Sequence, residues 1–422
     1  MSVLMRTQAH LDLIAAQDPD IRSFIRVDGD DALAAANAAD TRDVALSPLD
    51  GLLVAVKDNL AVTDKAWTAG IYGRRNLIAD GDAAAITRLR AAGTVIVGGA
   101  NMEEAALGAV TDNPTFGRCI NPLGKGLTAG GSSGGSAAAL AAGFVDLALG
   151  TDTMGSVRVP AAYCGVAGIK PTFGVIDRAG LAMLSPSLDT IGPMARDIQL
   201  LSPALRALSN PDFAASWPES AERSDLSGLT FGTPVQIREV ECEAAVLRGL
   251  QKATEAIQRL GGDVIEIDLN GWRPGKSRRA GLLVTEAEGA VELTDLINEP
   301  GAISDQLRAM LNYGRNASAE KVAAAREEIV VAAQSVESAF AKVDAILMPT
   351  TPQRAFPHGD PIPANQADLT ASANFSGCPA VALPVAIQGE TLPASVQLLA
   401  ARYADPHLLA WAEALTTELN QT

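Results

Sequence analysis

The chain has 422 residues, of which 48% are hydrophobic and 19% are charged, and its formal net charge is −16. This composition is ample for a sizeable core, and the negative charge argues against electrostatic binding to nucleic acid or to an anionic membrane surface. No apolar run reaches the roughly 18 residues of a membrane-spanning helix, and the N-terminus lacks the apolar region of a secretory signal. We therefore expect a cytoplasmic protein with no membrane partner and no nucleic-acid partner.

The first half of the chain alternates helical and strand-like patterns. Apolar residues at helical spacing predict a helical segment over residues 1–50. The apolar run 52–56 predicts a buried strand, the Ala/Leu run 137–142 a helix, and residues 144–149 a short buried strand. Helices and buried strands that alternate in this way are typical of an α/β protein.

The second half continues with similar elements. Residues 201–230 form a connection that ends in the strand-like stretch 228–232, and residues 264–269 also predict a strand. Two amphipathic helices are predicted over 241–262 and 316–343. The expected inner face of the second helix consists of Ala323, Ile329, Val330, Ala333 and Val336.

Residues 130–160 carry the most specific pattern, because paired serines in a glycine-rich loop precede a third serine in a second glycine-containing turn. The stretch GGSSGGS (130–136) has the composition of a flexible linker. The predicted helix and strand that follow it argue for a folded unit instead. Small residues there let backbone amides approach a reacting atom.

At these residues the chain resembles the amidase signature family of serine hydrolases. The resemblance implies a nucleophile at Ser156, a bridging serine in a cis peptide at Ser132 and a general base at Lys57. It also implies a mixed central β-sheet covered by helices on both faces. The blocks that carry it are GLLVAVKDN (51–59), NMEEAALG (101–108), GGSSGGS (130–136), GTDTMGSVRVPAAYCG (150–165), GIKPTFG (168–174) and SLDTIGPMARD (187–197), with weaker agreement in DAILMPTTP (344–352) and NFSGCPAVALPV (374–385).

The resemblance and the chain length together suggest one amidase domain over residues 1–422, because the blocks run from Gly51 to beyond Pro384 and must come together. Its expected parts are an N-terminal helical segment, a catalytic core, a variable substrate-facing segment and a C-terminal return to the core. These parts span residues 1–50, 51–200, about 201–340 and 341–422.

The residues support a lysine base independently. The chain has three histidines, none of which lies in the motif blocks, whereas a Ser-His-Asp device needs a histidine beside the nucleophile. Lys57 ends a predicted buried strand, where desolvation would lower its pKa and favour the neutral amine. The alternative is a strand-end lysine that reaches water. We expect a proton relay from Ser156 through Ser132 to Lys57, with Ser133 steadying it by hydrogen bonding.

The nucleophile turn should supply the oxyanion hole through the backbone amides of Thr153, Met154, Gly155 and Ser156. The family usually has glycine where this chain has Met154. Either Met154 has ordinary dihedral angles and its side chain shapes the acyl pocket, or the turn is distorted and catalysis is weak. Gly131 and Met154 are accordingly the expected substrate-binding positions.

Asp152 and Arg158 flank the nucleophile and carry opposite charges. We expect a partly buried ion pair that holds the turn in shape. Arg158 has an alternative role, in which it binds a substrate carboxylate with both arms of its guanidinium group.

Four cysteines, Cys119, Cys164, Cys242 and Cys378, lack a CxxC motif and a nearby histidine, so neither a metal site nor a disulfide scaffold is expected, and no cofactor is expected either. The stretch 271–277 imitates a phosphate-binding loop, but it has three residues between its glycines instead of four, one of them proline. We do not expect a nucleotide there.

These patterns favour an amidase that cleaves a small linear carboxamide through an acyl-enzyme on Ser156. The alternatives are the glutaminase (A) subunit of a tRNA-dependent amidotransferase, a carboxybiuret or urea-derivative hydrolase, and a non-catalytic protein that keeps the fold. The expected partner is a small-molecule amide, with a homodimer left open. Substrate choice is assigned to the variable segment, and the proposed acyl-side wall consists of Leu184, Trp272 and Tyr313.

Overall fold

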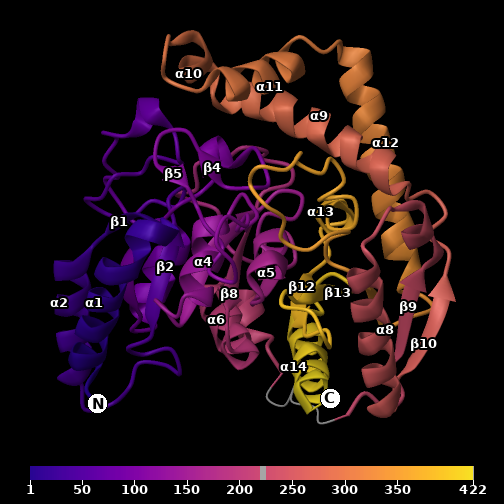
Figure 1. The fold of residues 1–422 in the computed structure, drawn as a ribbon, viewed down its shortest axis with the longest axis horizontal. Coiled ribbons are helices and arrows are strands. Elements are labelled where there is room, and N and C mark those ends of the chain that lie inside the picture. Colours follow the sequence, from indigo (N-terminus) through magenta and orange to yellow (C-terminus); the bar gives the residue numbers. More distant parts are fainter. Residues whose placement is uncertain (219–224, 422) are drawn as a thin grey trace.

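A long mixed β-sheet forms the centre of the molecule (Figure 1). The computed structural model describes residues 1–218 and 225–421, and within these ranges the sheet has 11 strands in the order β1-β3-β2-β6-β8-β7-β12-β13-β11-β9-β10. The expected α/β fold with a mixed central sheet is therefore confirmed. The strands are β1 (Phe24–Val27), β2 (Leu53–Lys57), β3 (Val95–Ala100), β6 (Leu147–Asp152), β7 (Ala167–Lys170), β8 (Thr190–Ala195), β9 (Thr230–Pro234), β10 (Asp263–Ile267), β11 (Ala345–Pro349), β12 (Ala380–Val385) and β13 (Ala394–Ala400), with β4 (Asp112–Asn113) and β5 (Gly117–Arg118) as a separate hairpin.

Strand β2 lies between two parallel neighbours, β3 and β6, and β6 then pairs antiparallel with β8. Because β2 and β6 run in the same direction and in register from Val54↔Leu147 to Val56↔Leu149, their carboxyl ends meet at one edge of the sheet. Lys57 ends β2 and Asp152 ends β6 at that edge. The loops that follow these strands are therefore brought together.

Both faces of the sheet are covered by helices. Neighbouring residues of a strand point to opposite faces, and those of β2 are buried on both, so each face needs a covering layer. Leu53 and Ala55 of β2 pack with residues of α1, α2, α4 and α5, whereas Val54 and Val56 pack with residues of α3, α6, α8 and α14. The covering helices are α1 (Val3–Ile21), α2 (Gly29–Asp40), α4 (Gly134–Ala141) and α5 (Arg158–Cys164) on one face, and α3 (Ala84–Ala91), α6 (Leu201–Leu208), α8 (Ala244–Arg259) and α14 (Asp405–Gln421) on the other, with α7 (Pro211–Ala215) following α6.

A further group of helices lies together at the top of Figure 1. It consists of α9 (Pro274–Glu292), α10 (Thr294–Asn298), α11 (Asp305–Arg315) and α12 (Ala319–Ala339), and α9 also packs against the short α13 (Ala371–Phe375). This group comes from the segment to which the sequence assigned substrate choice. None of the helices in the described ranges combines the length and the apolar character needed to cross a membrane.

The predicted strands and helices are present, with shifted boundaries. The expectation of a mere connection over 201–230 is wrong for its first half, which contains α6 and α7, and residues 219–224 of that range lie outside the described residues. The strand expected over 144–149 is β6, which begins at Leu147 and extends to Asp152. The helix expected over 137–142 is α4, which already begins at Gly134, so the glycine-rich loop supplies its first turn. The expectation of a purely helical segment over 1–50 is wrong, because β1 separates α1 from α2 and extends the sheet beyond β3.

The predicted inner face of α12 is displaced by about one position. Ile329 and Val336 are buried as expected, but Ala323 is exposed and Val330 is 51% exposed. The buried face instead runs through Ala325, Glu328, Ile329, Ala332, Val336 and Ala339. Glu328 belongs to it because it pairs with cations of α9 and of the preceding loop, a polar contact that apolar periodicity does not reveal.

Candidate active site

The carboxyl end of β2 delivers Lys57 into a polar cluster that is closed to solvent. Its side chain is fully buried, and its Nζ donates hydrogen bonds of 2.8 Å to Ser132 Oγ and 2.8 Å to Thr151 Oγ1. The Thr151 hydroxyl also accepts a 3.0 Å hydrogen bond from Asn59 Nδ2. The Lys57 ammonium or amine group is thus fixed between two hydroxyls instead of reaching water.

Burial lowers the pKa of Lys57 from 10.5 to about 7, because the charged form loses its hydration. The negative charges of Asp189, Asp152 and Glu103 act in the opposite direction but do not compensate for the burial. Near neutral pH a substantial share of Lys57 is therefore the neutral amine, which has a lone pair that can accept a proton.

Ser132 lies in the glycine-rich loop just before α4, and the peptide bond from Gly131 to Ser132 is cis. The next residue, Ser133, connects this loop to its neighbours. Its Oγ donates to the Thr151 carbonyl over 3.2 Å, and its backbone N–H donates to the Ser156 carbonyl over 3.2 Å. The loop of Ser132, strand β6 and the turn of Ser156 are therefore joined directly.

The turn that carries Ser156 is held from within by the carboxylate of Asp152. This carboxylate accepts hydrogen bonds from the N–H groups of Gly155 (2.7 Å) and Val157 (3.2 Å). On the other side, the hydroxyl of Thr370 donates a 2.6 Å hydrogen bond to the Met154 carbonyl. Ser156 itself is partly exposed.

These contacts correct the expected set of oxyanion donors. The Gly155 N–H already binds Asp152, so it is engaged and is not available to an oxyanion. Within the described part of the chain, no protein acceptor is recorded for the N–H groups of Thr153, Met154 and Ser156. These three amides are the remaining candidates.

Met154 has an ordinary backbone, since the positive φ in this turn belongs to Gly155, at +134°. A Cβ at Gly155 would lie 2.3 Å from Thr370 Oγ1, so only glycine fits there. The Met154 side chain lies against α9, where a Cβ on Gly281 would be 2.7 Å from its Sδ. Of the two interpretations of Met154, these features favour the one in which its side chain shapes a pocket.

Arg158 and Asp152 form a fully buried ion pair, with Nε donating to Oδ2 and Nη2 to Oδ1 over 3.0 Å each. The remaining guanidinium donors bind the Thr370 carbonyl, Gln397 Oε1 and Asn374 Oδ1 over 2.7–2.9 Å. Arg158 and further hydrogen bonds hold the pKa of Asp152 at about 2 despite its burial. With its donors engaged inside the protein, Arg158 favours the structural interpretation over that of a substrate ligand.

A cavity of about 190 Å³ opens beside the turn that carries Ser156. Its lining includes Gly131 and residues 153–156, together with loop residues 106–109, several side chains of α9 and the segment 363–367. Both positions expected to bind substrate, Gly131 and Met154, thus line one space with Ser156. Among the proposed wall residues Leu184 lines this cavity, but Trp272 is buried in a core cluster elsewhere and Tyr313 is 54% exposed.

Sequence reasoning missed several polar residues around the cluster. Thr151 accepts from Lys57, and Asn59 donates to Thr151. Asp189 accepts a 2.6 Å hydrogen bond from Thr153 Oγ1 and further ones from the backbone amides of Leu184 and Ser185. Thr151, Asn59 and Asp189 all lie inside blocks that the resemblance covers. The pattern that could have pointed to them is a polar residue close to either end of a buried strand, since Asn59 follows β2, Thr151 lies near the end of β6 and Asp189 precedes β8.

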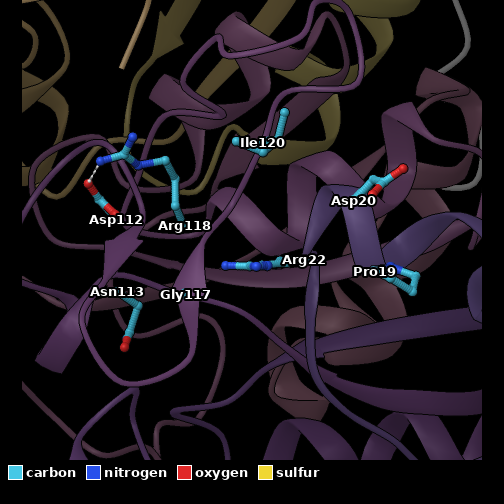
Figure 2. Close-up of a pocket in the computed structure, with 8 residues that line it drawn as sticks. All are labelled: Pro19, Asp20, Arg22, Asp112, Asn113, Gly117, Arg118 and Ile120. Atoms are coloured by element: carbon cyan, nitrogen blue, oxygen red, sulfur yellow. Dashed lines mark hydrogen bonds and ion pairs between the residues drawn. The ribbon is translucent and has the colours of Figure 1, made fainter. Parts of the chain in front are cut away.

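Other features that attract attention do not join this cluster. A hollow of about 550 Å³ lies between the C-terminal end of α1 and the β4–β5 hairpin. Figure 2 shows the residues that line it, among which Arg118 pairs with Asp112. It shares no lining residue with the Ser156 cavity. No group of three or more His, Cys, Asp or Glu side chains in residues 1–218 and 225–421 is arranged to hold a metal ion.

Cys164 and the stretch 271–277, which imitates a phosphate-binding loop, make contacts that serve the packing of the protein. Cys164 is buried and its thiol contacts the Ala129 carbonyl, and burial raises its pKa well above the usual value. In the imitation loop, Lys276 and Ser277 bind the carboxylate of Glu328 over 2.8 and 2.9 Å. These two side chains serve the packing of α9 on α12.

Comparison with known families identifies the class. The family model described as Amidase matches residues 6–409, and the 11-stranded mixed sheet agrees with amidase structures. The chain therefore belongs to the amidase signature family, whose members are hydrolases that act on C–N bonds.

Among curated proteins, the chain is 33% identical to the A subunit of the glutamyl-tRNA(Gln) amidotransferase of Synechococcus sp. strain RCC307, over 94% of this chain and 90% of that protein. The corresponding protein of Thermus thermophilus is 34% identical to the chain, over 97% of this chain and 92% of that protein. A crystal structure of an amidase superposes with a TM-score of 0.90 at 29% identity, covering 99% of this chain and 96% of the other. Another solved structure comes from a complex described as vestigial and as revealing the evolutionary origins of an s-triazine catabolic enzyme. It superposes with a TM-score of 0.89 at 32% sequence identity, covering 99% of this chain and 95% of that chain.

Proposed function

We propose that the protein is a serine amidase that hydrolyses the C–N bond of a small linear carboxamide through an acyl-enzyme on Ser156. One observation carries the proposal. A fully buried Lys57 with a pKa near 7 lies 2.8 Å from the hydroxyl of Ser132, whose loop is hydrogen-bonded to the turn of Ser156. A desolvated amine at this position has the properties of a general base.

In the first step, the Ser156 hydroxyl attacks the amide carbonyl carbon while its proton passes to Ser132 and the Ser132 proton passes to the neutral amine of Lys57. A C–O bond forms, and the carbonyl π electrons move to the oxygen. The amides of Thr153, Met154 and Ser156 are the proposed donors to this oxyanion. Thr151 keeps the Lys57 amine aligned, because its hydroxyl accepts from Nζ.

In the second step, the proton returns along the same path from Lys57 through Ser132 to the leaving nitrogen, and the C–N bond breaks. Ammonia or an amine departs, which leaves an ester between the acyl group and Ser156 Oγ. Water then attacks this ester with the same relay as base, and the acid product is released. Asp152, Arg158 and Ser133 act by holding the two loops in place, since their side chains contact protein groups.

A fluorophosphonate probe tests the proposal directly, since it reacts with activated serines. The wild type should be labelled once, at Ser156, and the Ser156→Ala variant should not be labelled. Lys57→Ala should slow labelling by about a thousandfold, in the range found when members of a catalytic triad are removed. Ser136→Ala is a matched control, because Ser136 is a buried loop serine whose hydroxyl donates to the Leu149 carbonyl. Normal labelling of Lys57→Ala would overturn the relay.

The second candidate is the glutaminase subunit of a tRNA-dependent amidotransferase, which the identity of 33–34% to such subunits favours. This function predicts glutaminase activity that appears only with partner subunits and tRNA. Against it, the turn of this chain has Met154 and Val159 where such subunits usually have glycine and glutamine. Amidase activity of the isolated chain would exclude the need for partners.

A carboxybiuret or urea-derivative hydrolase is a third candidate, favoured by the 32% identity to the protein linked to an s-triazine catabolic enzyme. Such a function predicts preferential turnover of biuret-like substrates over simple carboxamides. It also predicts that a partner chain copurifies with the protein, as the complex of that relative suggests.

A further inference from the structure

The cavity beside Ser156 is apolar on most sides but has one polar wall. Its apolar lining includes Leu107, Leu184 and Leu282, whereas Arg278 and Thr285 of α9 and Gln366 of the segment before α13 supply polar atoms. Among the described residues that line the cavity, Arg278 is the one with a charged side chain. A substrate that reaches Ser156 therefore meets a cation and no carboxylate of the lining.

Arg278 has donors to spare. Its Nε donates a 2.6 Å hydrogen bond to Asp368 Oδ1, and its side chain is 15% exposed. In the described part of the chain, no acceptor is recorded for its Nη1 and Nη2 groups. The two Nη groups of a guanidinium bind the two oxygens of a carboxylate in a planar arrangement, and a mostly buried guanidinium benefits strongly from such a partner.

The other two polar side chains also offer donors. Gln366 Oε1 accepts a 3.0 Å hydrogen bond from the Tyr163 hydroxyl, which in turn accepts from Gln353 Nε2, so the Gln366 amide is fixed with its NH₂ group as the free end. Thr285 Oγ1 is buried and has no hydrogen-bond partner in the described structure. A buried hydroxyl without a partner is costly unless a ligand or water completes it.

We propose that Arg278, assisted by Gln366 and Thr285, binds a carboxylate of the substrate, so that the preferred substrates are monoamides of short dicarboxylic acids. The inference rests on the proposed function, because it needs Ser156 to attack the amide end of the same molecule. A cavity of about 190 Å³ admits only a short chain between the two ends. Arg158 cannot take this role in the present geometry, since its donors are bound inside the protein.

The test compares succinamate with succinamide, which differ only in a carboxylate replaced by a neutral carboxamide. The wild type should have a higher kcat/KM for succinamate. Arg278→Gln should lower the succinamate-to-succinamide ratio of kcat/KM by about 10- to 100-fold, as expected for a lost charge-assisted hydrogen bond, and mainly through KM for succinamate. Arg278→Lys should give an intermediate succinamate-to-succinamide ratio of kcat/KM, because lysine keeps the positive charge but cannot bind both carboxylate oxygens in the planar arrangement of a guanidinium.

Two variants separate this role from a structural one. Arg279→Gln changes the neighbouring, exposed arginine of α9 and should leave the ratio unchanged. Asp368→Asn removes the ion-pair partner of Arg278 and keeps its charge, so the preference for succinamate should remain. If Arg278→Gln slowed both substrates equally, or if Asp368→Asn abolished the preference as Arg278→Gln does, Arg278 would serve only to hold Asp368 and the inference would be overturned.

Calorimetry on inactive protein distinguishes the two proposals. Ser156→Ala should bind succinamate, and Ser156→Ala/Arg278→Gln should bind it at least tenfold more weakly. Suppose that the wild type hydrolyses neither amide, while Ser156→Ala binds succinamate and the added Arg278→Gln change weakens that binding. The proposed amidase function would then fail, whereas the assignment of Arg278 as a carboxylate-binding residue would stand. If amides were hydrolysed but succinamate bound no better than succinamide, the carboxylate site would fail alone.

Discussion

Lys57 Nζ and Ser132 Oγ lie 2.8 Å apart at a place where both side chains are fully buried. Removal of Lys57 from water lowers its pKa to about 7, while the two hydroxyls around Nζ keep it in place. This pair is the link between the fold and the proposed chemistry. It exists because β2 ends at Lys57 beside the loop that precedes α4.

The first prediction concerns the pH dependence of amide hydrolysis. Protonation of Lys57 removes the lone pair that accepts the Ser132 proton, so kcat/KM should be low in acid, rise with an apparent midpoint near 7 and level off at higher pH. Steady-state kinetics on a neutral amide between pH 5 and 9.5 measure this profile. A rate that is independent of pH across this range would contradict a Lys57 base.

The second prediction is that Lys57→Met inactivates the protein but stabilises it. A buried lysine whose charged form is disfavoured costs folding free energy, and methionine fills similar space without that cost. We expect a rise in Tm of roughly 2 °C at pH 6.5, which calorimetry measures.

The control for this variant is the direction in which its stability advantage over the wild type changes with pH. Between pH 7 and 10.5 the unfolded chain binds a proton at Lys57 that the folded protein does not, so the wild type gains stability as pH rises through this window. The advantage of Lys57→Met should therefore shrink from pH 6.5 to pH 9.5. An advantage that grew with pH would show that Lys57 is not buried in the way described.

The third prediction concerns the buried pair of Arg158 and Asp152. Arg158→Met should destabilise the protein by about 3–5 kcal/mol, because it leaves the Asp152 carboxylate buried without its cation. Activity should fall equally for neutral and for carboxylate-bearing amides, since Arg158 does not line the Ser156 cavity. Chemical denaturation and paired kinetics measure the two effects. A loss confined to carboxylate-bearing amides would instead support the alternative role of Arg158 as a substrate ligand.

The same pair gives an acid-side test. The pKa of Asp152 lies at about 2 in the folded protein, below its usual value of 3.8, so its contribution to stability is complete above about pH 4 and is lost as pH falls through 2. The stability difference between wild type and Arg158→Met should therefore narrow in that window. A difference that stayed constant down to pH 2 would mean that the charge of Asp152 contributes little.

The fold class could be predicted from the alternation of helical and strand-like patterns together with the family resemblance. The strand that ends at Lys57 could be predicted because its apolar run is too short for a typical helix. The sequence also placed the serine loops correctly relative to a helix and a strand. Boundaries were harder to predict, since the first turn of α4 consists of Gly134, Gly135 and Ser136, residues whose intrinsic preference is not helical and which tertiary packing holds in place.

The polar wall of the cavity illustrates what sequence periodicity cannot supply. Arg278 and Arg279 are adjacent and identical in type, yet one lines the cavity and the other is exposed, a difference set by the exact rotation of α9. Likewise, nothing in the spacing of Gly155 and Asp152 indicated that the amide of Gly155 would be engaged by that carboxylate. Such contacts depend on side-chain geometry across elements far apart in the chain.

The last prediction concerns the size of the acyl group. Met154 has ordinary dihedral angles and lines the cavity beside Leu282, so Met154→Ala should enlarge the pocket without disturbing the turn. We expect kcat/KM for amides with an acyl chain one or two methylenes longer to rise by about tenfold relative to short ones. Gly281→Ala should act in the opposite direction, because its Cβ would lie 2.7 Å from Met154 Sδ and 2.6 Å from Phe375 Cζ, which presses Met154 toward the cavity. If both variants kept the wild-type chain-length profile, Met154 would not bound the acyl pocket, and the choice of acyl group would fall to the residues of α9 alone.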